Sequence, residues 1–360
     1  MTVEMAWFSA LCDDDYEFLG QRDEHLQASW EHCRNIVLTA DRHGYDNVLL
    51  PSGYALGIDN TAFAAGIAVL AERLRLLLAV RCGELIVPQL ARQLATIDQM
   101  LDGRLTINII SSEMPGESLE SAPRYRRSTE VMFALRELLN GKPVKLDGEF
   151  VSLDVEPPRV RTVNGQSPLF YFGGLSPAAR ECAAAGADVF LVWPDTTAGF
   201  LDVKADMDAR AAAKGRTLRY GWRSHVIVRP TEDEARAAAA RLLSRLDDEE
   251  GARIRKQSLD SASAGVARQA ELRESADNDG YIERHLWTGV GRARSGAGAA
   301  IVGDPDQVLA KINELAEAGI DAFILSGYPH AAECDLFARY VLPGIDHGPL
   351  TFTPDPVSLT

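Results

Sequence analysis

Residues 221–229 have the sequence Gly-Trp-Arg-Ser-His-Val-Ile-Val-Arg, which predicts a β-strand because it is rich in β-branched and aromatic residues. Side chains alternate between the two faces of a strand, so Arg223 and His225 share one face while Trp222 and Val226 share the other. In a half-buried strand the charged face normally looks at solvent. In a closed barrel it would look inward, so the role of this stretch depends on the strands around it.

Seven further short apolar runs have the character of buried strands, and helical periodicity follows each of them. These runs are 3–8, 47–50, 74–81, 105–110, 169–172, 188–191 and 322–325. A hairpin is also predicted between residues 144 and 153. Alternation of buried strands and helices predicts parallel pairing with right-handed crossovers, and closure into a (β/α)8 TIM barrel. An open doubly wound sheet is the alternative.

One segment interrupts this alternation after the strand at 221–229. Residues 247–300 form a long insertion in the seventh repeat, dense in charge at first and rich in Gly, Ser and Ala later. Insertions of this length are commonly functional lids, and the glycines around Arg294 favour a mobile segment that closes over a ligand. We therefore expect one barrel domain over residues 1–346, followed by a tail at 347–360 that either packs across a subunit interface or is disordered.

The composition and net charge of the chain disfavour several classes of function. The chain has 360 residues, 46% of them hydrophobic, and a formal net charge of −15, which disfavours nucleic acid and anionic membranes as partners. No secretory signal and no membrane-spanning run is recognised. The five cysteines are scattered without metal-ligand spacing, so we expect reduced thiols, no metal site and a cytoplasmic location.

Polar residues gather at the predicted strand exits, where a barrel places its chemistry. Gly173, Gly174 and Ser176 lie between a strand and a helix, so their backbone and the helix start suit a phosphate, although a plain turn capped by Ser176 would have the same sequence. A second anion site is predicted from four side chains of three segments: the strand at 221–229, the insertion and the exit of the last strand. They are Arg223, His225, Arg294 and Tyr328. Two anion sites indicate a phosphorylated cofactor beside an anionic substrate.

Several stretches also carry a family pattern. They are Pro88 with 91–98, 103–104, 171–174, Trp193, 223–229, 286–291, 294–298 and 324–330. The chain resembles the bacterial luciferase-like flavin monooxygenases in these stretches, which are spread over nearly its whole length. Within that family it is most similar to the alkanesulfonate monooxygenase group.

The resemblance implies a two-component enzyme. Its cofactor would be reduced FMN, supplied by a separate NAD(P)H-dependent flavin reductase, and O2 would be the co-substrate. The reaction would cleave the carbon–sulfur bond of an organosulfonate and give sulfite and an aldehyde. The flavin-site positions are matched by Asn108, Tyr125, Gly173, Gly174 and Ser176. The sulfonate-binding and catalytic positions are matched by Trp193, Arg223, His225, Arg294 and Tyr328.

Two departures from the group concern the substrate. The loop after the second strand lacks the group's cysteine, and the first strand ends in Cys12 and Asp13–Asp15 rather than a histidine. Carboxylates suit hydroxyl groups better than an alkyl tail. Together with residues 1–20 and 52–59, this resembles the branch that acts on sulfoquinovose, a sugar sulfonate. A simple alkanesulfonate enzyme, a deazaflavin-dependent oxidoreductase, a luciferase-like aldehyde oxygenase and a non-catalytic flavin-binding barrel remain as alternatives. A homo-oligomer is expected.

Overall fold

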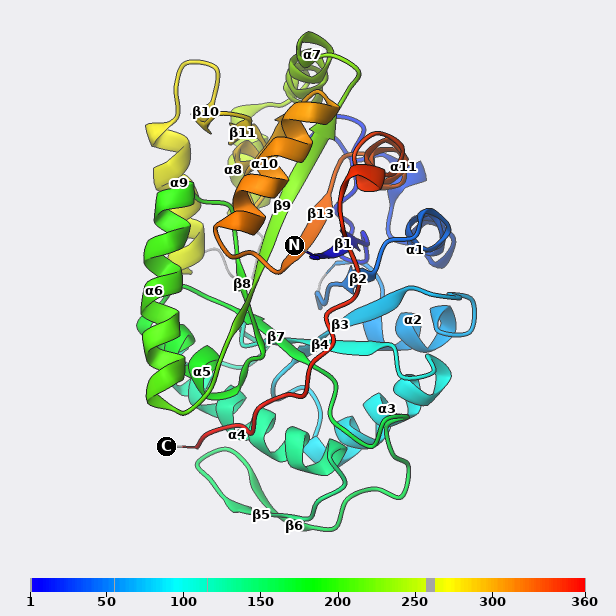
Figure 1. Ribbon diagram of the computed structural model, residues 1–360, viewed down its shortest axis with the longest axis vertical. Helices are drawn as coiled ribbons and strands as arrows, with labels where there is room; N and C mark the ends of the chain where they lie inside the picture. The colour runs from blue at the N-terminus through cyan, green and yellow to red at the C-terminus, as the bar shows by residue number, and fades with distance from the viewer. Residues whose placement is uncertain (1, 55, 115, 257–262, 360) are drawn as a thin grey trace.

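The computed structural model describes residues 2–54, 56–114, 116–256 and 263–359, and its strands and helices alternate along the chain (Figure 1). Within these residues, eight parallel strands close into a barrel in the order β1-β2-β3-β4-β7-β8-β9-β13, with β13 returning to β1. The strands are β1 (Glu4–Phe8), β2 (Asn47–Leu50), β3 (Arg75–Arg81), β4 (Leu105–Ile110), β7 (Phe170–Gly173), β8 (Val189–Val192), β9 (Arg219–Val228) and β13 (Ala322–Ser326). The predicted TIM barrel is confirmed. The open doubly wound sheet is wrong, because β9 pairs with both β8 and β13.

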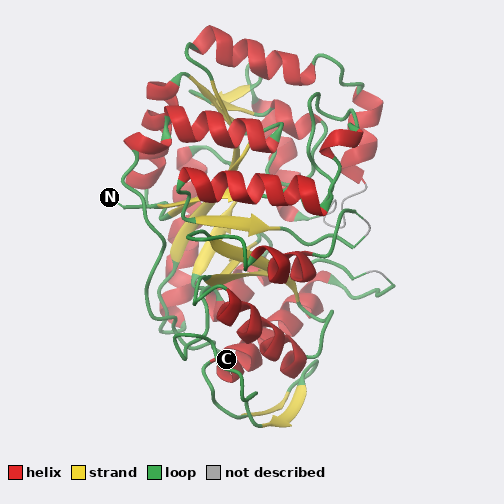
Figure 2. Ribbon diagram, turned by 90° about the vertical axis from the view of Figure 1, so that its right-hand side faces the viewer, coloured by secondary structure: helices red, strands yellow, loops and turns green. Residues whose placement is uncertain are grey.

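Helices surround the barrel strands on the outside (Figure 2). They are α1 (Trp30–His43), α2 (Asn60–Ile67), α3 (Val87–Met100), α4 (Ser121–Leu139), α5 (Pro177–Gly186), α6 (Thr197–Ala213), α7 (Glu232–Leu243), α10 (Pro305–Glu317) and α11 (His330–Tyr340). Helix α1 is capped at both ends, since the Ser29 hydroxyl accepts from the His32 N–H and Gly44 has a positive φ of 79°. The predicted hairpin is confirmed as β5 (Val144–Asp147) paired with β6 (Ser152–Val155).

Side-chain alternation along the strands divides the core into an outer and an inner part. The outer part lies between strands and helices and includes Trp7 and Trp222. The inner part lies inside the barrel and includes Phe8, Tyr171 and Ile324. On β9 the outward positions are apolar except for Ser224, and the remaining positions, which include Arg223 and His225, point into the barrel.

The predicted insertion is more ordered than a loop. It contains α8 (Asp248–Lys256), α9 (Ala264–Ser275), β10 (Tyr281–Glu283), β11 (Leu286–Trp287) and a 3-10 turn at Gly289–Arg292. It leads into an additional strand, β12 (Ala300–Gly303), which pairs in parallel with residues 225–228 of β9. Strand β12 was missed because its Ala and Gly content has low strand propensity. Residues 257–262 of the insertion lie outside the described residues.

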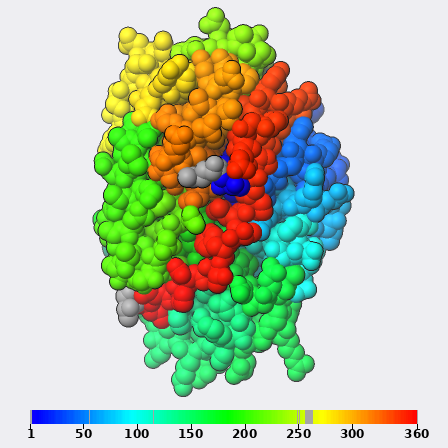
Figure 3. All heavy atoms as spheres, viewed as in Figure 1, coloured from blue at the N-terminus to red at the C-terminus, as the bar shows by residue number. Residues whose placement is uncertain are grey.

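The tail lies against the end of the barrel where the strands begin. Leu350 and Phe352 pack against the inner core, and the Leu350 N–H donates to the buried Glu4 carboxylate at 3.2 Å. The tail crosses the same face as the N-terminus, in red in Figure 3. In this structure the tail therefore covers its own barrel.

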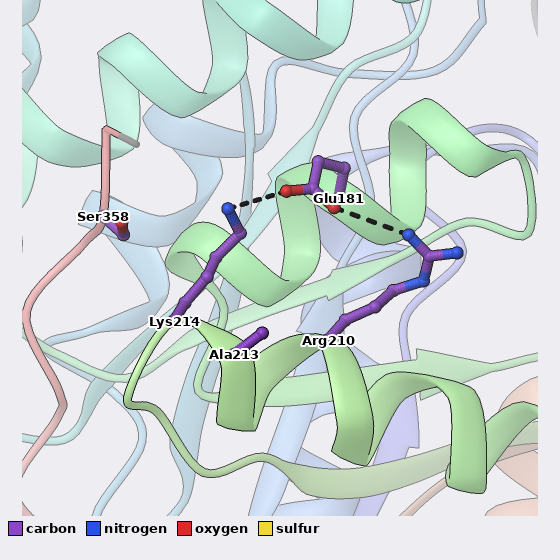
Figure 4. A pocket seen from close by; sticks show the side chains of 5 residues that line it. All are labelled: Glu181, Arg210, Ala213, Lys214 and Ser358. Carbon is purple, nitrogen blue, oxygen red and sulfur yellow. Dashed lines mark hydrogen bonds and ion pairs between the residues drawn. The ribbon is translucent and has the colours of Figure 1, made fainter.

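The tail also borders a surface cavity of about 490 Å³ between α5 and α6, lined by Glu181, Arg210, Ala213, Lys214 and Ser358 (Figure 4). Its charges pair with one another, since Glu181 lies 2.6 Å from Lys214 Nζ and 3.5 Å from Arg210 Nη1. None of the predicted site residues lines it. Across the described ranges, we find no helix with the length and apolar character to cross a bilayer.

Candidate active site

Strand β9 carries Arg223 and His225 into the barrel, and β13 lies beside them in register. Arg223 Nη1 donates to the Ser326 hydroxyl at 2.9 Å and to the Ser224 carbonyl at 2.7 Å. His225 Nδ1 lies 2.9 Å from the same Ser326 hydroxyl. The exposed fractions of Arg223 and His225 are only 5% and 1%. Ser326 thus fixes both side chains from the neighbouring strand.

Arg294 reaches the same place from the insertion. Its Nη1 donates to the Tyr328 hydroxyl at 2.7 Å and to the Asp14 carboxylate, which lies in the loop after β1. Arg223, His225, Arg294 and Tyr328 are therefore brought together, as the sequence predicted. We expected Arg294 to arrive by closure of a lid, whereas here it already lies in the cluster. Movement of the insertion stays a prediction.

Four aromatic rings, those of Phe8, His225, Tyr328 and His330, lie in or against this cluster. Tyr328 stacks between the rings of His225 and His330, with centroid distances of 4.9 and 5.1 Å. The Arg223 and Arg294 guanidinium carbons lie 4.3 and 5.4 Å from the centroid of the Phe8 ring. Guanidinium groups are attracted to aromatic faces, so Phe8 helps to hold two like charges near each other.

Burial determines the charges of these groups. It lowers the pKa of Arg223 to about 9, with Arg294 adding to the effect, and lowers the pKa of His225 well below its usual value. Burial also lowers the pKa of His330. For Asp14 burial is the largest effect and raises the pKa, but the charges and the hydrogen bond around the carboxylate, chiefly those of Arg294, together outweigh it and the pKa falls. At neutral pH the cluster therefore has two cations, one carboxylate and two neutral imidazoles.

Several buried polar atoms of the cluster have no hydrogen-bond partner of good geometry among the described residues. They are Asp14 Oδ1, Arg223 Nη2, His225 Nε2, Arg294 Nε and both ring nitrogens of His330. The Ala297 carbonyl lies near enough to His225 to counter part of the lowering of its pKa. An unpartnered buried polar atom costs about 1–3 kcal/mol. The cluster is thus suited to a ligand rich in oxygen, such as an oxyanion.

Trp193 follows β8 and lies against the insertion. A side chain on Gly265 of α9 would come within 2.8 Å of the Trp193 ring, and one on Gly296 within 3.5 Å. Helix α9 is held to the same β8 exit by Arg268, which binds the Asp195 carboxylate through two nitrogens at 2.8 Å. Trp193 is therefore placed next to the loop that carries Arg294.

Gly173, Gly174 and Ser176 lie where β7 leads into α5. A Cβ on Gly173 would lie 2.6 Å from the Leu191 carbonyl oxygen, and one on Gly174, whose φ is +152°, would lie 2.7 Å from the Ala179 methyl. The Ser176 hydroxyl accepts from the Ala179 N–H at 3.2 Å and begins the helix. This bare backbone at a helix start fits a phosphate group. The capped turn considered as the alternative is also present, so the two interpretations are compatible.

Tyr125 and Asn108 border this turn. The Tyr125 ring meets Phe172 edge to face at 6.1 Å, and its hydroxyl lies 3.6 Å from the position of a Cβ on Gly174. Asn108 lies in β4, opposite Tyr171 of β7. The group assigned to the flavin therefore lies on β4, α4 and β7. The β8 exit with Trp193 separates it from the group on β9 and β13.

Three residues of the cluster were not among the predicted site residues, although the carboxylates of Asp13–Asp15 together were expected to suit substrate hydroxyl groups. Asp14, Ser326 and His330 lie in strand exits that were recognised as polar, but no local pattern distinguished them from their neighbours. Their importance depends on contacts with residues distant in sequence, such as the pair of Asp14 with Arg294.

Comparison with known proteins identifies the family. Residues 17–322 match the family model of luciferase-like monooxygenases. The chain belongs to this family. It is 62% identical to the sulfoquinovose monooxygenase of Novosphingobium aromaticivorans, covering 96% of this chain and 98% of the relative. It is 51% identical to the sulfoquinovose monooxygenase of Agrobacterium fabrum, over 95% of this chain and 89% of that relative. Among solved structures, a riboflavin lyase with modified FMN and riboflavin has the same fold, with a TM-score of 0.78, 16% identity and coverage of 100% and 95%.

Proposed function

We propose that this luciferase-like monooxygenase cleaves the carbon–sulfur bond of sulfoquinovose, using reduced FMN and O2. Family membership supports use of a flavin, and the high identity to two sulfoquinovose monooxygenases over nearly the whole chain supports the substrate. One oxygen atom of O2 would enter the aldehyde, 6-oxo-glucose, and the other would leave as water. The sulfur would leave as sulfite, and the flavin would be released as oxidised FMN.

One structural observation carries the proposal. Two guanidinium groups, of the buried Arg223 and of Arg294, whose side chain is 17% exposed, lie in one cluster, and each keeps a buried nitrogen without a partner among the described residues. Guanidinium groups donate paired hydrogen bonds to tetrahedral oxyanions, and a sulfonate is such an anion. Arg223 and Arg294 would hold the sulfonate, and His225 would donate from Nε2. Burial and Asp14 raise the pKa of Tyr328, so its phenol stays protonated: its oxygen accepts from Arg294, and its O–H can donate to the ligand.

The flavin would bind through Gly173, Gly174 and Ser176, with Asn108 and Tyr125 beside it. When bound, reduced FMN supplies the two electrons that activate O2. Residues of the chain would bind the flavin and exclude water. The turn before α5 would orient the phosphate, and the Trp193 ring with the insertion would keep water from the reacting centre. The flavin would come from a separate NAD(P)H-dependent reductase. Cytoplasmic location and a homo-oligomeric state are also part of the proposal.

The test is sulfite release by the purified protein supplied with FMN, a flavin reductase, NADH and O2. We expect sulfite from sulfoquinovose in proportion to the sugar aldehyde formed, and a loss of at least tenfold in kcat/KM for Arg223→Lys, because Lys cannot present paired donors. The exposed Arg236→Lys is the control. Sulfite from hexane-1-sulfonate alone would contradict the substrate, and no sulfite from either would contradict the reaction. Size-exclusion chromatography with light scattering tests the oligomer.

A further inference from the structure

The cluster around Arg223 and Arg294 includes a carboxylate, that of Asp14, which sulfonate binding does not require. Asp14 follows β1, and its side chain is 16% exposed. One carboxylate oxygen, Oδ2, binds Arg294, while Oδ1 is buried with no hydrogen-bond partner among the described residues. A carboxylate near a sulfonate site weakens binding of the anion by repulsion. Its presence therefore indicates a second task.

Net charge limits what that task can be. Arg223 and Arg294 bring two positive charges, and His225 and His330 are neutral, so Asp14 leaves these five side chains with one net positive charge. The neighbouring Asp15 carboxylate is outside this sum, because it binds His32 Nε2 at 2.9 Å. One positive charge matches one sulfonate. Asp14 thus balances the site while keeping an oxygen that can only accept hydrogen bonds. The complementary group on a ligand is a donor, and in an organosulfonate that donor is a hydroxyl.

We propose that Asp14 determines the substrate class by accepting a hydrogen bond at Oδ1 from a hydroxyl group of a polyhydroxylated sulfonate. This inference rests on the proposed function, because it places the substrate in the cluster of Arg223 and Arg294. A hydroxylated sulfonate satisfies Oδ1 when it displaces water. An unsubstituted alkanesulfonate leaves the same oxygen buried and unpaired, so the site rejects it.

The expected discrimination is smaller than the largest known for such sites. A site built to bind a substrate hydroxyl can discriminate against the analogue without it by about 10⁴- to 10⁵-fold. Asp14 is also engaged with Arg294, and a six-carbon alkyl chain recovers some affinity from apolar contacts. We therefore expect the ratio of kcat/KM for sulfoquinovose to that for hexane-1-sulfonate to be about 100 or more in the unaltered protein.

The experiment compares these two six-carbon sulfonates in Asp14 variants. Asp14→Ala is expected to lower the ratio of kcat/KM values at least about tenfold, in favour of hexane-1-sulfonate, and Asp14→Asn to lower it less, since an amide keeps one acceptor. Glu17→Gln is the matched control. Glu17 lies in the same loop but pairs with the exposed Arg241, so its removal should leave the ratio unchanged.

A second readout separates this inference from the proposed function. Calorimetric titration measures the Kd of each sulfonate without turnover, and the same change in ratio is expected there. If the unaltered protein binds sulfoquinovose selectively but releases no sulfite, the proposed reaction fails and the role of Asp14 stands. If the protein turns over sulfoquinovose and the Asp14 variants keep its selectivity, the role of Asp14 is wrong.

Two other outcomes also contradict the inference. If the Asp14 variants lower kcat/KM equally for both sulfonates, Asp14 only positions Arg294, on which both substrates depend. If they raise kcat/KM equally for both, Asp14 competes with the sulfonate for Arg294. FMN binding, followed by protein fluorescence, confirms that each variant is folded. If Asp14→Ala fails this check, Asp14→Asn carries the test with the same expected direction.

Discussion

The Ser326 hydroxyl lies 2.9 Å from Nδ1 of His225, where β13 and β9 are in register. Arg223 donates to the same oxygen at 2.9 Å, and a guanidinium has no acceptor, so the hydroxyl accepts from Arg223 and keeps its proton for His225. Burial and the two arginines lower the pKa of His225, so the ring is neutral. Its proton is therefore on Nε2, on the side that lacks a partner of good geometry.

Replacing this hydroxyl tests the tautomer. Ser326→Ala removes the donor to Nδ1 and frees Arg223, so we expect kcat/KM for sulfite release to fall about tenfold while FMN binding is unchanged. Nitrogen NMR of the histidine rings should show the loss of the single tautomer. Ser224→Ala, on the opposite face of β9, is the control. Equal effects of the two variants would contradict the assignment.

The turn before α5 allows a test of the flavin site. Gly174→Ala would place a methyl 2.7 Å from Ala179 at a φ that L-residues rarely adopt, so the turn must move. We expect the Kd for FMN to rise about tenfold or more. Gly215→Ala shares the strain of a positive φ, +67°, but meets no atom within 4 Å. It should lower thermal stability and leave FMN binding unchanged. If both variants bind FMN normally, the phosphate lies elsewhere.

Local pattern was enough to predict the barrel and half of the site. Arg223 and His225 are two residues apart on one strand, so alternation alone places them on one face. Arg294 and Asp14 are 280 residues apart, and only the fold brings them together. Strand β12 was missed because burial between β9 and the insertion, rather than intrinsic propensity, stabilises it. The sequence predicted that Arg223, His225, Arg294 and Tyr328 lie together, but not that Asp14, Ser326 and His330 contact them.

Stability should depend on pH through His330. The folded state keeps this ring neutral because burial lowers its pKa below the usual 6.5, whereas the unfolded chain binds a proton as the pH falls through that value. On account of this group the free energy of unfolding therefore falls as the pH drops below 6.5, by at most about 1.4 kcal/mol per pH unit, until the pH reaches the lowered pKa of the folded state. His330→Gln should show a smaller decrease between pH 6.5 and 5.5 in thermal or urea unfolding. The exposed His25→Gln should keep the original slope, and an unchanged slope in His330→Gln would contradict the prediction.

The attachment of α9 offers a test of the insertion. Gln269 donates to the Pro194 carbonyl at 2.7 Å and accepts from the Gly298 N–H at 3.1 Å, so it ties the insertion to the β8 exit. Gln269→Ala should speed hydrogen exchange over residues 289–299 and lower kcat/KM about fivefold, by loosening Arg294. Glu274→Ala, an exposed change on the same helix, is the control. Unchanged exchange would mean that other contacts hold the segment.

The contacts of the tail bear on two alternatives that the sequence left open, packing across a subunit interface or disorder. Leu350 and Phe352 pack on the barrel of their own chain, and the Arg75 guanidinium donates to the Leu350 carbonyl at 2.7 Å. Truncation after His347 would expose this apolar end of the barrel, at a cost of about 3 kcal/mol, and lower the melting temperature by roughly 4 °C. The oligomeric state should stay the same. Dissociation of an oligomer on truncation would instead show that the tail packs across a subunit interface, and an unchanged melting temperature would show that it is dispensable to the fold.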